Sequence, residues 1–329
     1  RSRSENGSPP FRRVRSQKEN KSMRTLAVVT GASRGYGAAL ALALASGWRG
    51  GVDIALVARD ARELDAVREQ VRVEAEHRSD DDGAVTASVH GMDLGDLDAL
   101  DRGLDGVFAA LDPAEHDRAV LFNNAGNLGD LCPVGSFDGG GDAAAERAAR
   151  LSTWRSAVDL NVTSSCWLAE RFVGELERAG LVGRRVPVAA PSLLVNVSSL
   201  AAEQPFPSWG AYCAGKAARD MLLRVVGSER RAEELRVLNW APGPMRTAMT
   251  DSILSSPTVD ADILASFRDM AATGTFVDSA QSAARCVEIL AAATFESGAH
   301  IDFFESDAHC AAEASGEASG GASGEAGGA

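Results

Sequence analysis

The stretch LAVVTGASRGYGAALALALA, residues 26–45, decides the fold. Its first five residues are an apolar run typical of a buried strand, and its alanine- and leucine-rich end favours a helix. Gly31, Gly35 and Gly37 lie in the turn between them. A phosphate-binding turn needs backbone N–H groups close to the ligand, and side chains would obstruct that approach. The stretch therefore predicts a strand, a dinucleotide-binding turn and a helix.

Strand-like and helix-like segments alternate along the rest of the chain. Residues 244–275 are less periodic and predict a lid over the site. The alternation predicts one α/β domain at 23–306, a Rossmann-type doubly wound parallel sheet with helices on both faces. Further strands are expected at 53–58, 85–90, 119–126, 192–199, 235–243 and 300–304, and helices at 38–45, 60–78, 96–111, from 139–150 to about 180, 211–226 and 283–293.

The composition is that of a globular protein with an acidic body. The chain has 329 residues, 45% hydrophobic and 24% charged, with a formal net charge of −13. Residues 1–22 hold seven Lys or Arg and two Glu, so they carry about +5 and the remainder about −18. An acidic body repels a polyanion, so we expect no nucleic-acid partner.

No apolar run reaches the length of a membrane span, and no secretory signal is visible. The five cysteines are scattered without a CxxC, which favours a reducing compartment, the cytoplasm, over disulfides or a metal site. The basic segment 1–22 is expected to be a disordered extension, although it could be a transit peptide. The Ala/Gly/Ser-rich segment 307–329 is expected to be a disordered tail.

A candidate catalytic group lies near the motif YCAGK. Tyr212 and Lys216 are four residues apart, so a helix places them on one face. A nearby ammonium is expected to lower the pKa of the phenol, which can then exchange a proton with a carbonyl. Ser199, at the end of a strand, can hold the same oxygen. A Tyr–Lys pair alone is common on amphipathic helices, but its order after the glycine turn, NNAG, Asn161 and Ser199 is specific.

Arg59 bears on the choice of cofactor. It follows the second strand, where NAD-binding proteins usually carry an acidic residue for the ribose hydroxyls. An arginine suits the 2′-phosphate of NADP(H), and Arg34 could add a second contact. Asp60 is adjacent and would suit NAD, and Arg59 could be an ordinary surface residue. The sequence favours NADP(H).

These motifs resemble those of the short-chain dehydrogenase/reductase family over about residues 24–304. TGASRGYG (30–37) matches its cofactor turn, NNAG (123–126) its motif after the fourth strand, and Pro242-Gly243 its PG. Asn161, Ser199, Tyr212 and Lys216 match its catalytic tetrad. The resemblance implies hydride transfer with a nicotinamide cofactor. Family members of this type are typically homodimers, which we expect here, although the segments 139–150 and 178–191 look additional.

Three longer segments resemble the sepiapterin reductases of this family: residues 196–223, 236–247 and 297–304. The resemblance implies NADPH-dependent reduction of side-chain carbonyls of a pterin, sepiapterin or 6-pyruvoyl-tetrahydropterin, in tetrahydrobiopterin biosynthesis. It also implies that Asp302 anchors the guanidine-like edge of the pterin, since a carboxylate accepts two parallel N–H bonds. From spacing alone Asp302 would be a solvated aspartate. Phe304 departs from the tyrosine common near this end.

The resemblance implies a role for each matching residue. Tyr212 donates the proton, Ser199 orients the carbonyl, Asn161 holds a relay water, and Lys216 binds the nicotinamide ribose and tunes Tyr212. The implied substrate contacts are Ser199, Leu200, Trp209, Tyr212, Gly243 and Asp302, and the implied cofactor contacts are Gly31, Ala32, Ser33, Arg34, Gly35, Tyr36, Gly37, Arg59, Asp60, Asp93, Leu94, Asn124, Lys216, Met245, Arg246, Thr247 and Thr250.

Two other functions stay open. One is a short-chain carbonyl reductase acting on a non-pterin ketone or dicarbonyl, because substrate choice in this fold lies in the variable lid. The other is an NADPH-binding regulator without turnover, against which the intact tetrad argues. Cys213, next to Tyr212, is expected to be a packing residue rather than a redox group.

Overall fold

The structure is a computed structural model that describes residues 23–79, 82–136, 142–183 and 190–307. The predicted disordered segment 1–22 lies outside the described residues, as does 308–329 of the predicted tail. The same holds for parts of the two additional segments, 137–141 and 184–189.

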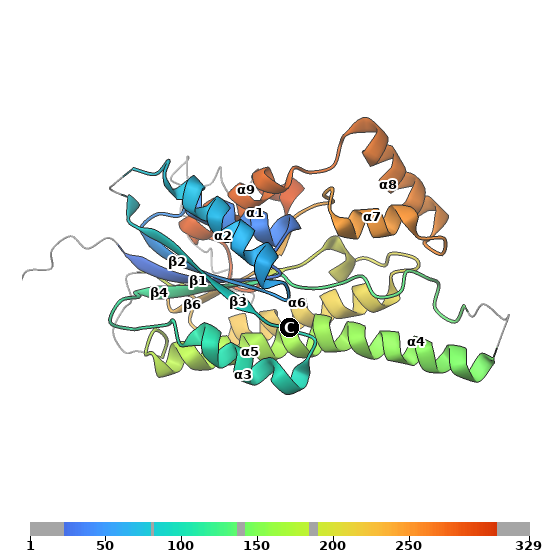
Figure 1. The fold of residues 1–329 in the computed structure, drawn as a ribbon, viewed down its shortest axis with the longest axis horizontal. Coiled ribbons are helices and arrows are strands. Elements are labelled where there is room, and N and C mark those ends of the chain that lie inside the picture. The colour runs from blue at the N-terminus through green and yellow to red at the C-terminus, as the bar shows by residue number, and fades with distance from the viewer. Residues whose placement is uncertain (1–22, 80–81, 137–141, 184–189, 308–329) are drawn as a thin grey trace, which may run out of the picture.

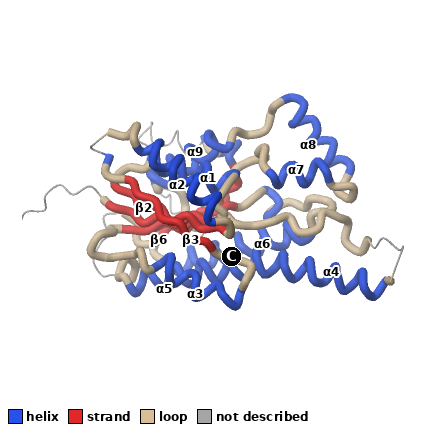
Figure 2. Tube along the Cα trace, in the orientation of Figure 1, coloured by secondary structure: helices blue, strands red, loops and turns tan. Residues whose placement is uncertain are grey.

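A seven-stranded parallel sheet forms the centre of the molecule, in the order β3-β2-β1-β4-β5-β6-β7 (Figures 1 and 2). The predicted doubly wound sheet is therefore confirmed. The order reverses between β1 and β4, and in such sheets ligands bind at the carboxyl ends of the strands beside this reversal. The strands are β1 (Arg24–Thr30), β2 (Gly51–Ala58), β3 (Val85–Gly91), β4 (Arg118–Asn123), β5 (Ser192–Val197), β6 (Leu235–Ala241) and β7 (Ala299–Asp302).

Helices cover both faces of the sheet (Figure 1). One face packs against α1 (Gly35–Gly47), α2 (Ala61–Ala75) and α9 (Ser279–Ala292). The other packs against α3 (Leu97–Phe108), α5 (Ser164–Arg178) and α6 (Gly210–Glu229), with α4 (Ala143–Val158) against α6. Alternate residues of β1 supply the two cores: Ala27 and Val29 face the first layer, while Leu26 and Val28 face the second. Residues two apart on a strand share a face.

The segment 244–275, predicted to be an irregular lid, contains two helices, α7 (Ala248–Ser255) and α8 (Ala261–Thr273). They project from the body at the carboxyl ends of the strands (Figure 1). The apolar residues Ile263, Leu264, Phe267 and Met270 share one face of α8 and are half-buried, while no residue of this helix is fully buried. The sequence analysis did not recognise this short stripe.

The long helix predicted through Asn161 is interrupted. One π-helical turn, Asp159–Thr163, separates α4 from α5, and it contains Asn161. Such turns insert one extra residue into a helix and are frequent at functional sites.

Candidate active site

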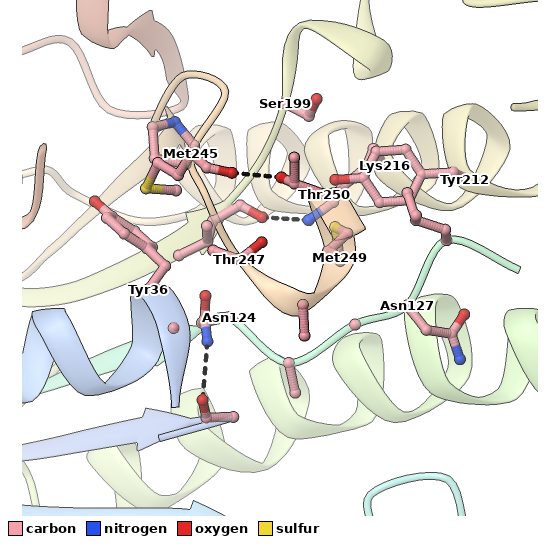
Figure 3. Close-up of a pocket in the computed structure, with 18 of the residues that line it drawn as sticks. Tyr36, Asn124, Asn127, Ser199, Tyr212, Lys216, Met245, Thr247, Met249 and Thr250 are labelled. Atoms are coloured by element: carbon pink, nitrogen blue, oxygen red, sulfur yellow. Dashed lines mark hydrogen bonds between the residues drawn. The ribbon is translucent and has the colours of Figure 1, made fainter. Parts of the chain in front are cut away.

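One large cavity opens at the carboxyl ends of the strands, with a volume of about 2120 Å³. It runs from the glycine turn past α6 to the lid, and Figure 3 shows part of its lining. Every predicted site residue lines it except Ala32 and Asn161, both of which are buried behind its wall. Residues from the carboxyl ends of all seven strands of the sheet and from helices α1, α6 and α7 are thus brought together.

The glycine turn has the form of an anion-binding site. Gly31 and Gly35 have positive φ angles of 65° and 56°, which other residues seldom adopt. A Cβ on Gly37 would overlap the Gly31 carbonyl oxygen and lie 2.7 Å from Asn124 Nδ2. Arg34, the N-cap of α1, makes no side-chain cap, so the first-turn N–H groups are left to a ligand. These residues fit the pyrophosphate of a dinucleotide.

Tyr36 contributes to this turn through its backbone rather than its ring. Its hydroxyl accepts a hydrogen bond from Trp240 Nε1 at 2.6 Å, deep between β6 and α9. Burial raises the pKa of this phenol well above its usual value, so it stays neutral. Ala32 is fully buried. Neither side chain is therefore free to hold a cofactor.

A group of arginines marks the end of the cavity beside β2 and α2. Arg34 and Arg59 line it as predicted, and Arg62, which the sequence analysis missed, lines it too. Asp60 caps α2: its Oδ1 accepts from the backbone N–H groups of Arg62 at 2.8 Å and Glu63 at 3.2 Å. Glu63 also lines this end, with Oε1 4.0 Å from Arg34 Nη1, so three arginines face two carboxylates there.

The next part of the cavity wall is held by hydrogen bonds between side chains and the backbone. Asn124 Nδ2 donates to the Thr30 carbonyl at 2.8 Å, joining β4 to β1. Asp93 Oδ1 accepts from Gly95 N at 2.9 Å, and Leu94 is buried beside it. On the opposite side, the Thr250 hydroxyl donates to the Met245 carbonyl (Figure 3), and Arg246 and Thr247 line the cavity with them.

Tyr212 and Lys216 lie one turn apart on α6, and both are buried. Lys216 Nζ donates to the Val197 carbonyl at 2.6 Å and lies 5.4 Å from the centre of the Tyr212 ring. Ser199, just beyond β5, accepts from Ala201 N at 3.2 Å and is half-exposed to the cavity. Figure 3 shows Ser199, Tyr212 and Lys216 on one side of the cavity.

The pKa of Tyr212 differs from the expectation. Burial raises it to about 12, although the Ser199 hydroxyl and the charge of Arg219 oppose the rise. Lys216 does not lower it, because burial holds the pKa of Lys216 itself well below its usual value. The predicted lowering by Lys216 is therefore wrong for the protein without bound ligand. The phenol is a protonated group poised to donate rather than a phenolate.

Arg219 is the main residue that the sequence analysis missed. It is fully buried on α6, three residues after Lys216. Its guanidinium donates to Asn196 Oδ1 at 2.7 Å, to the Ala125 carbonyl at 3.0 Å and to the Asn123 carbonyl. Burial lowers its pKa to about 10, which still leaves it charged at neutral pH. The signal available in the sequence was an arginine inside YCAGKAARD, a segment of the predicted apolar helix, because arginine is seldom buried unless it is paired.

Asn161 does not face the cavity. Its Oδ1 accepts from Asn127 N at 2.9 Å, and its Nδ2 donates to the Asn127 carbonyl at 2.9 Å. Gly126 and Gly215 make room for it, since a Cβ on either would lie 2.8 Å or 3.0 Å from its atoms. The side chain thus fixes the loop after NNAG, while its role with a relay water stays a prediction.

The far end of the cavity combines aromatic and acidic side chains. Trp209 stands edge-on to Tyr212, with ring centres 5.5 Å apart and an interplanar angle of 80°. Asp302 Oδ1 accepts from Phe304 N at 2.9 Å, and this carboxylate lines the cavity. Gly243 has a φ of 82°, and a Cβ there would lie 2.8 Å from Val277. Leu200 and several residues missed from the sequence complete this end: Glu203, Phe206, Ile263, Phe267, Met270 and His300.

Known proteins with similar sequences are reductases. A family model described as short chain dehydrogenase matches residues 25–257. Sepiapterin reductase of Rattus norvegicus is 33% identical over 278 residues, which cover 84% of this chain and 95% of that protein. Benzil reductase ((S)-benzoin forming) of Bacillus subtilis (strain 168) is 28% identical over 252 residues, covering 76% of this chain and 86% of that protein.

Solved structures share the fold. A 3-oxoacyl-[acyl-carrier protein] reductase from Brucella melitensis, in complex with NAD, superposes with a TM-score of 0.61 at 22% identity, covering 85% of this chain and 95% of that one. A putative NAD(P) dependent gluconate 5-dehydrogenase from Beutenbergia cavernae, with bound NADP, gives 0.62 at 23%, covering 84% and 94%. At these identities the likeness is one of fold.

Proposed function

The chain belongs to the short-chain dehydrogenase family, and from that premise we propose that it is an NADPH-dependent sepiapterin reductase. Family membership makes it an oxidoreductase that uses a nicotinamide cofactor. The substrate is a pterin with a carbonyl side chain, sepiapterin or 6-pyruvoyl-tetrahydropterin, as in tetrahydrobiopterin biosynthesis.

One observation carries the proposal: a proton donor, Tyr212, and a carboxylate that can anchor a pterin, Asp302, line the same cavity. Tyr212 and Ser199 lie on one wall, and Asp302 lies at the end of β7 on another. A carboxylate suits the guanidine-like edge of a pterin, which offers two parallel N–H donors. Asp302 Oδ1 already accepts one backbone N–H, and each carboxylate oxygen has a second lone pair for substrate.

The residues of this chain divide the reaction among them. NADPH, when bound, supplies the hydride. Tyr212, kept protonated by burial, donates its proton to the carbonyl oxygen as negative charge develops there. The Ser199 hydroxyl donates a hydrogen bond to the same oxygen. Arg219, charged at neutral pH, supplies positive charge beneath the site, and the buried setting makes that charge more effective than it would be in water. Lys216 lies beside the Tyr212 ring and donates a hydrogen bond to the Val197 carbonyl.

The arginines at the α2 end support NADP(H) over NAD(H). Arg34, Arg59 and Arg62 line the cavity there, and guanidinium groups match a 2′-phosphate. Asp60, the residue that would suit NAD, is engaged in capping α2.

A second substrate class has an observation in its favour. Phe206, Trp209 and Phe267 form an aromatic wall beside Tyr212, with neighbouring ring centres 5.4 Å and 5.9 Å apart. Such a wall suits an apolar diketone, and benzil reductase is among the relatives. A non-pterin dicarbonyl is therefore the alternative substrate.

The test is NADPH oxidation by the purified protein with sepiapterin, run beside NADH and beside benzil. We expect turnover with NADPH that falls 10²–10⁴-fold in Tyr212→Phe, which is about what a general acid contributes. Asp302→Ala should lose sepiapterin turnover and keep benzil turnover. If sepiapterin is not reduced while NADPH still binds and benzil is reduced, the dicarbonyl alternative replaces the proposal.

We further propose a homodimer located in the cytoplasm that takes a small-molecule substrate and no nucleic acid. In the described part of the chain, every helix is too short or too polar to cross a bilayer.

A further inference from the structure

A buried polar network lies beneath the active site and joins α6 to β7. Its centre is Asp220, a buried carboxylate one turn after Lys216. One of its oxygens accepts from Asn196 Nδ2 at 2.7 Å and from Ser198 Oγ at 2.5 Å. The other accepts from His300 Nδ1 at 2.6 Å. The network therefore runs from β5, through the catalytic helix, to the strand that carries Asp302.

Arg219 extends the network to a fourth element. Its Nε donates to Asn196 Oδ1 at 2.7 Å, and its Nη1 donates to the Ala125 carbonyl after β4. The links of Asn196 to Asp220 and Arg219 and of Ser198 to Asp220 are buried, and those of His300 and the Ala125 carbonyl are partly buried, so a lost hydrogen bond leaves a poorly satisfied group and the arrangement is rigid.

His300 occupies a specific position in this arrangement. It precedes Asp302 by two residues on β7, so both side chains lie on the same face of the strand. It lines the cavity, and its Nε2 is buried without a partner among the described residues. Glu203 Oε1 lies 4.0 Å from its Nδ1. Three carboxylates thus surround one imidazole: Asp220 on α6, Glu203 after β5, and Asp302 on its own strand.

These carboxylates favour the charged imidazolium. Burial opposes the charge, but the hydrogen bond to Asp220 and the charges of Asp220, Glu203 and Asp302 together raise the pKa of His300. A raised pKa means that the positive form is held below it and is lost as pH rises through it. Above that pH the charge of His300 is lost, and Arg219, which interacts with Asp220, is the cation that remains in the network.

We propose that His300, held by Asp220, is a positioning residue that fixes Asp302 on β7 relative to Tyr212 on α6. A pterin anchored at Asp302 then presents its carbonyl to Tyr212 and Ser199. The inference rests on the proposed function, because only a substrate with a guanidine-like edge uses Asp302.

The chain offers a matched control at the opposite end of the sheet. His116 is also buried and also pairs with a carboxylate, His116 Nε2 to Asp53 Oδ2 at 2.9 Å. It does not line the cavity. Both pairs support folding, but only the His300 pair touches an element of the substrate site.

The experiment measures KM and kcat for sepiapterin and for butane-2,3-dione, a small diketone without an edge for Asp302. The variants are His300→Leu, His300→Asn, Asp220→Asn and His116→Asn. We expect His300→Leu to raise the KM for sepiapterin about tenfold with little change in kcat. His300→Asn, whose amide can still donate to Asp220, should keep most of the affinity. The KM for butane-2,3-dione should not change in the His300 variants. In His116→Asn, the KM for sepiapterin and the KM for the diketone should both stay unchanged.

A pH series gives a second readout. In wild type the KM for sepiapterin should rise as His300 loses its proton, and in His300→Asn it should be flat between pH 6 and 9. If His300→Leu does not fold, as judged by near-UV circular dichroism and NADPH binding, the pH dependence of wild type and His300→Asn tests the inference in its place. Equal pH dependence in both proteins, or equal KM rises for both substrates, overturns the inference alone. A wild type that reduces the diketone but not sepiapterin overturns the proposed function and the inference with it.

Discussion

At the scale of the residue, the catalytic phenol shows how burial competes with neighbouring charge. Tyr212 lies near the Lys216 amine and the charged Arg219 guanidinium, yet its pKa rises to about 12 because the ring and hydroxyl are desolvated. Desolvation disfavours the charged form of any acid, and here it outweighs the charges nearby. A phenol in this state serves reduction, the direction in which a proton must be given.

The chain has two tyrosines, Tyr36 and Tyr212, which makes this prediction directly measurable. Burial raises the pKa of both. We expect no tyrosinate absorbance in the folded protein at pH 10, where an exposed tyrosine would be about half ionised. Unfolding in denaturant at the same pH should produce the signal from both. A tyrosinate that appears between pH 7 and 9 and vanishes in Tyr212→Phe would contradict this assignment.

The sequence could predict which residues line the site but not what the fold does to them. The positions of Tyr212, Lys216 and Ser199 follow from motif order. The direction of the Tyr212 pKa shift does not, because it depends on how much water the lid and α6 exclude. Arg219 and His300 also escaped prediction, since their partners Asn196 and Asp220 become neighbours only in the folded sheet.

At the scale of the element, the β1–α1 turn depends on close contact between the start of α1 and the backbone at the end of β1. Gly37 opens α1 directly against the Gly31 carbonyl and the Asn124 amide. No side chain fits between them, so the helix approaches the strand only because the Cβ is absent. The same approach aims the first-turn N–H groups at the cavity.

Gly37→Ala should therefore lose cofactor binding and stability together. Overpacking a site of this kind costs about 1–3 kcal/mol or more, because backbone must move. The matched control is Gly106→Ala on α3, where an added Cβ meets nothing within 4 Å. That change should stabilise by about 0.5–1 kcal/mol, because alanine favours helix over glycine. Urea unfolding and NADPH titration measure both effects. Normal NADPH binding by Gly37→Ala would refute this account of the turn.

Strands β1, β2, β4, β5 and β6 were predictable as elements because they are short apolar runs buried along most of their length. Strand β3, at the edge of the sheet, has no fully buried residue. Helices α7 and α8 were not predictable, because the apolar stripe of α8 is short and only half-buried, and its packing partner is a small cluster around Trp209 that forms only in the folded protein. Asp260 caps the start of α8 through the N–H groups of Asp262 and Ile263, and Gly274 ends it in the left-handed conformation. The π-helical turn at Asn161 was equally hidden, because the local sequence reads as a continuous helix.

At the scale of the whole molecule, the helical layer formed by α4, α5 and α6 exposes large apolar side chains on its outer surface. Large hydrophobic side chains are exposed on α4, α5 and α6, which cover the same face of the sheet. Exposed apolar patches of this kind mark protein interfaces. A second copy of the chain is the occupant that we propose, through these residues: Leu151, Trp154, Val158, Trp167, Met221 and Val225.

Light scattering on a sizing column tests the dimer. We expect a mass of twice 34.3 kDa for wild type and a shift towards the monomer in Val225→Arg. Val73→Arg on α2 is the matched control: both valines are 42% exposed, but α2 lies on the other face of the sheet. The control should stay dimeric. If Val225→Arg stays dimeric as well, the interface lies elsewhere.

The position of the α7–α8 lid bears on how the substrate preference of this protein can change by mutation. Ile263, Phe267 and Met270 of α8 line the substrate cavity, yet none of them belongs to the two cores that flank the sheet. Ile263 and Phe267 pack against a smaller cluster around Trp209, so mutations there leave the packing of the sheet unchanged, and the wall opposite Tyr212 can vary while the turn, the tetrad and the sheet stay the same. Mutations in the lid can thus change which carbonyl compound the protein binds without disrupting the fold.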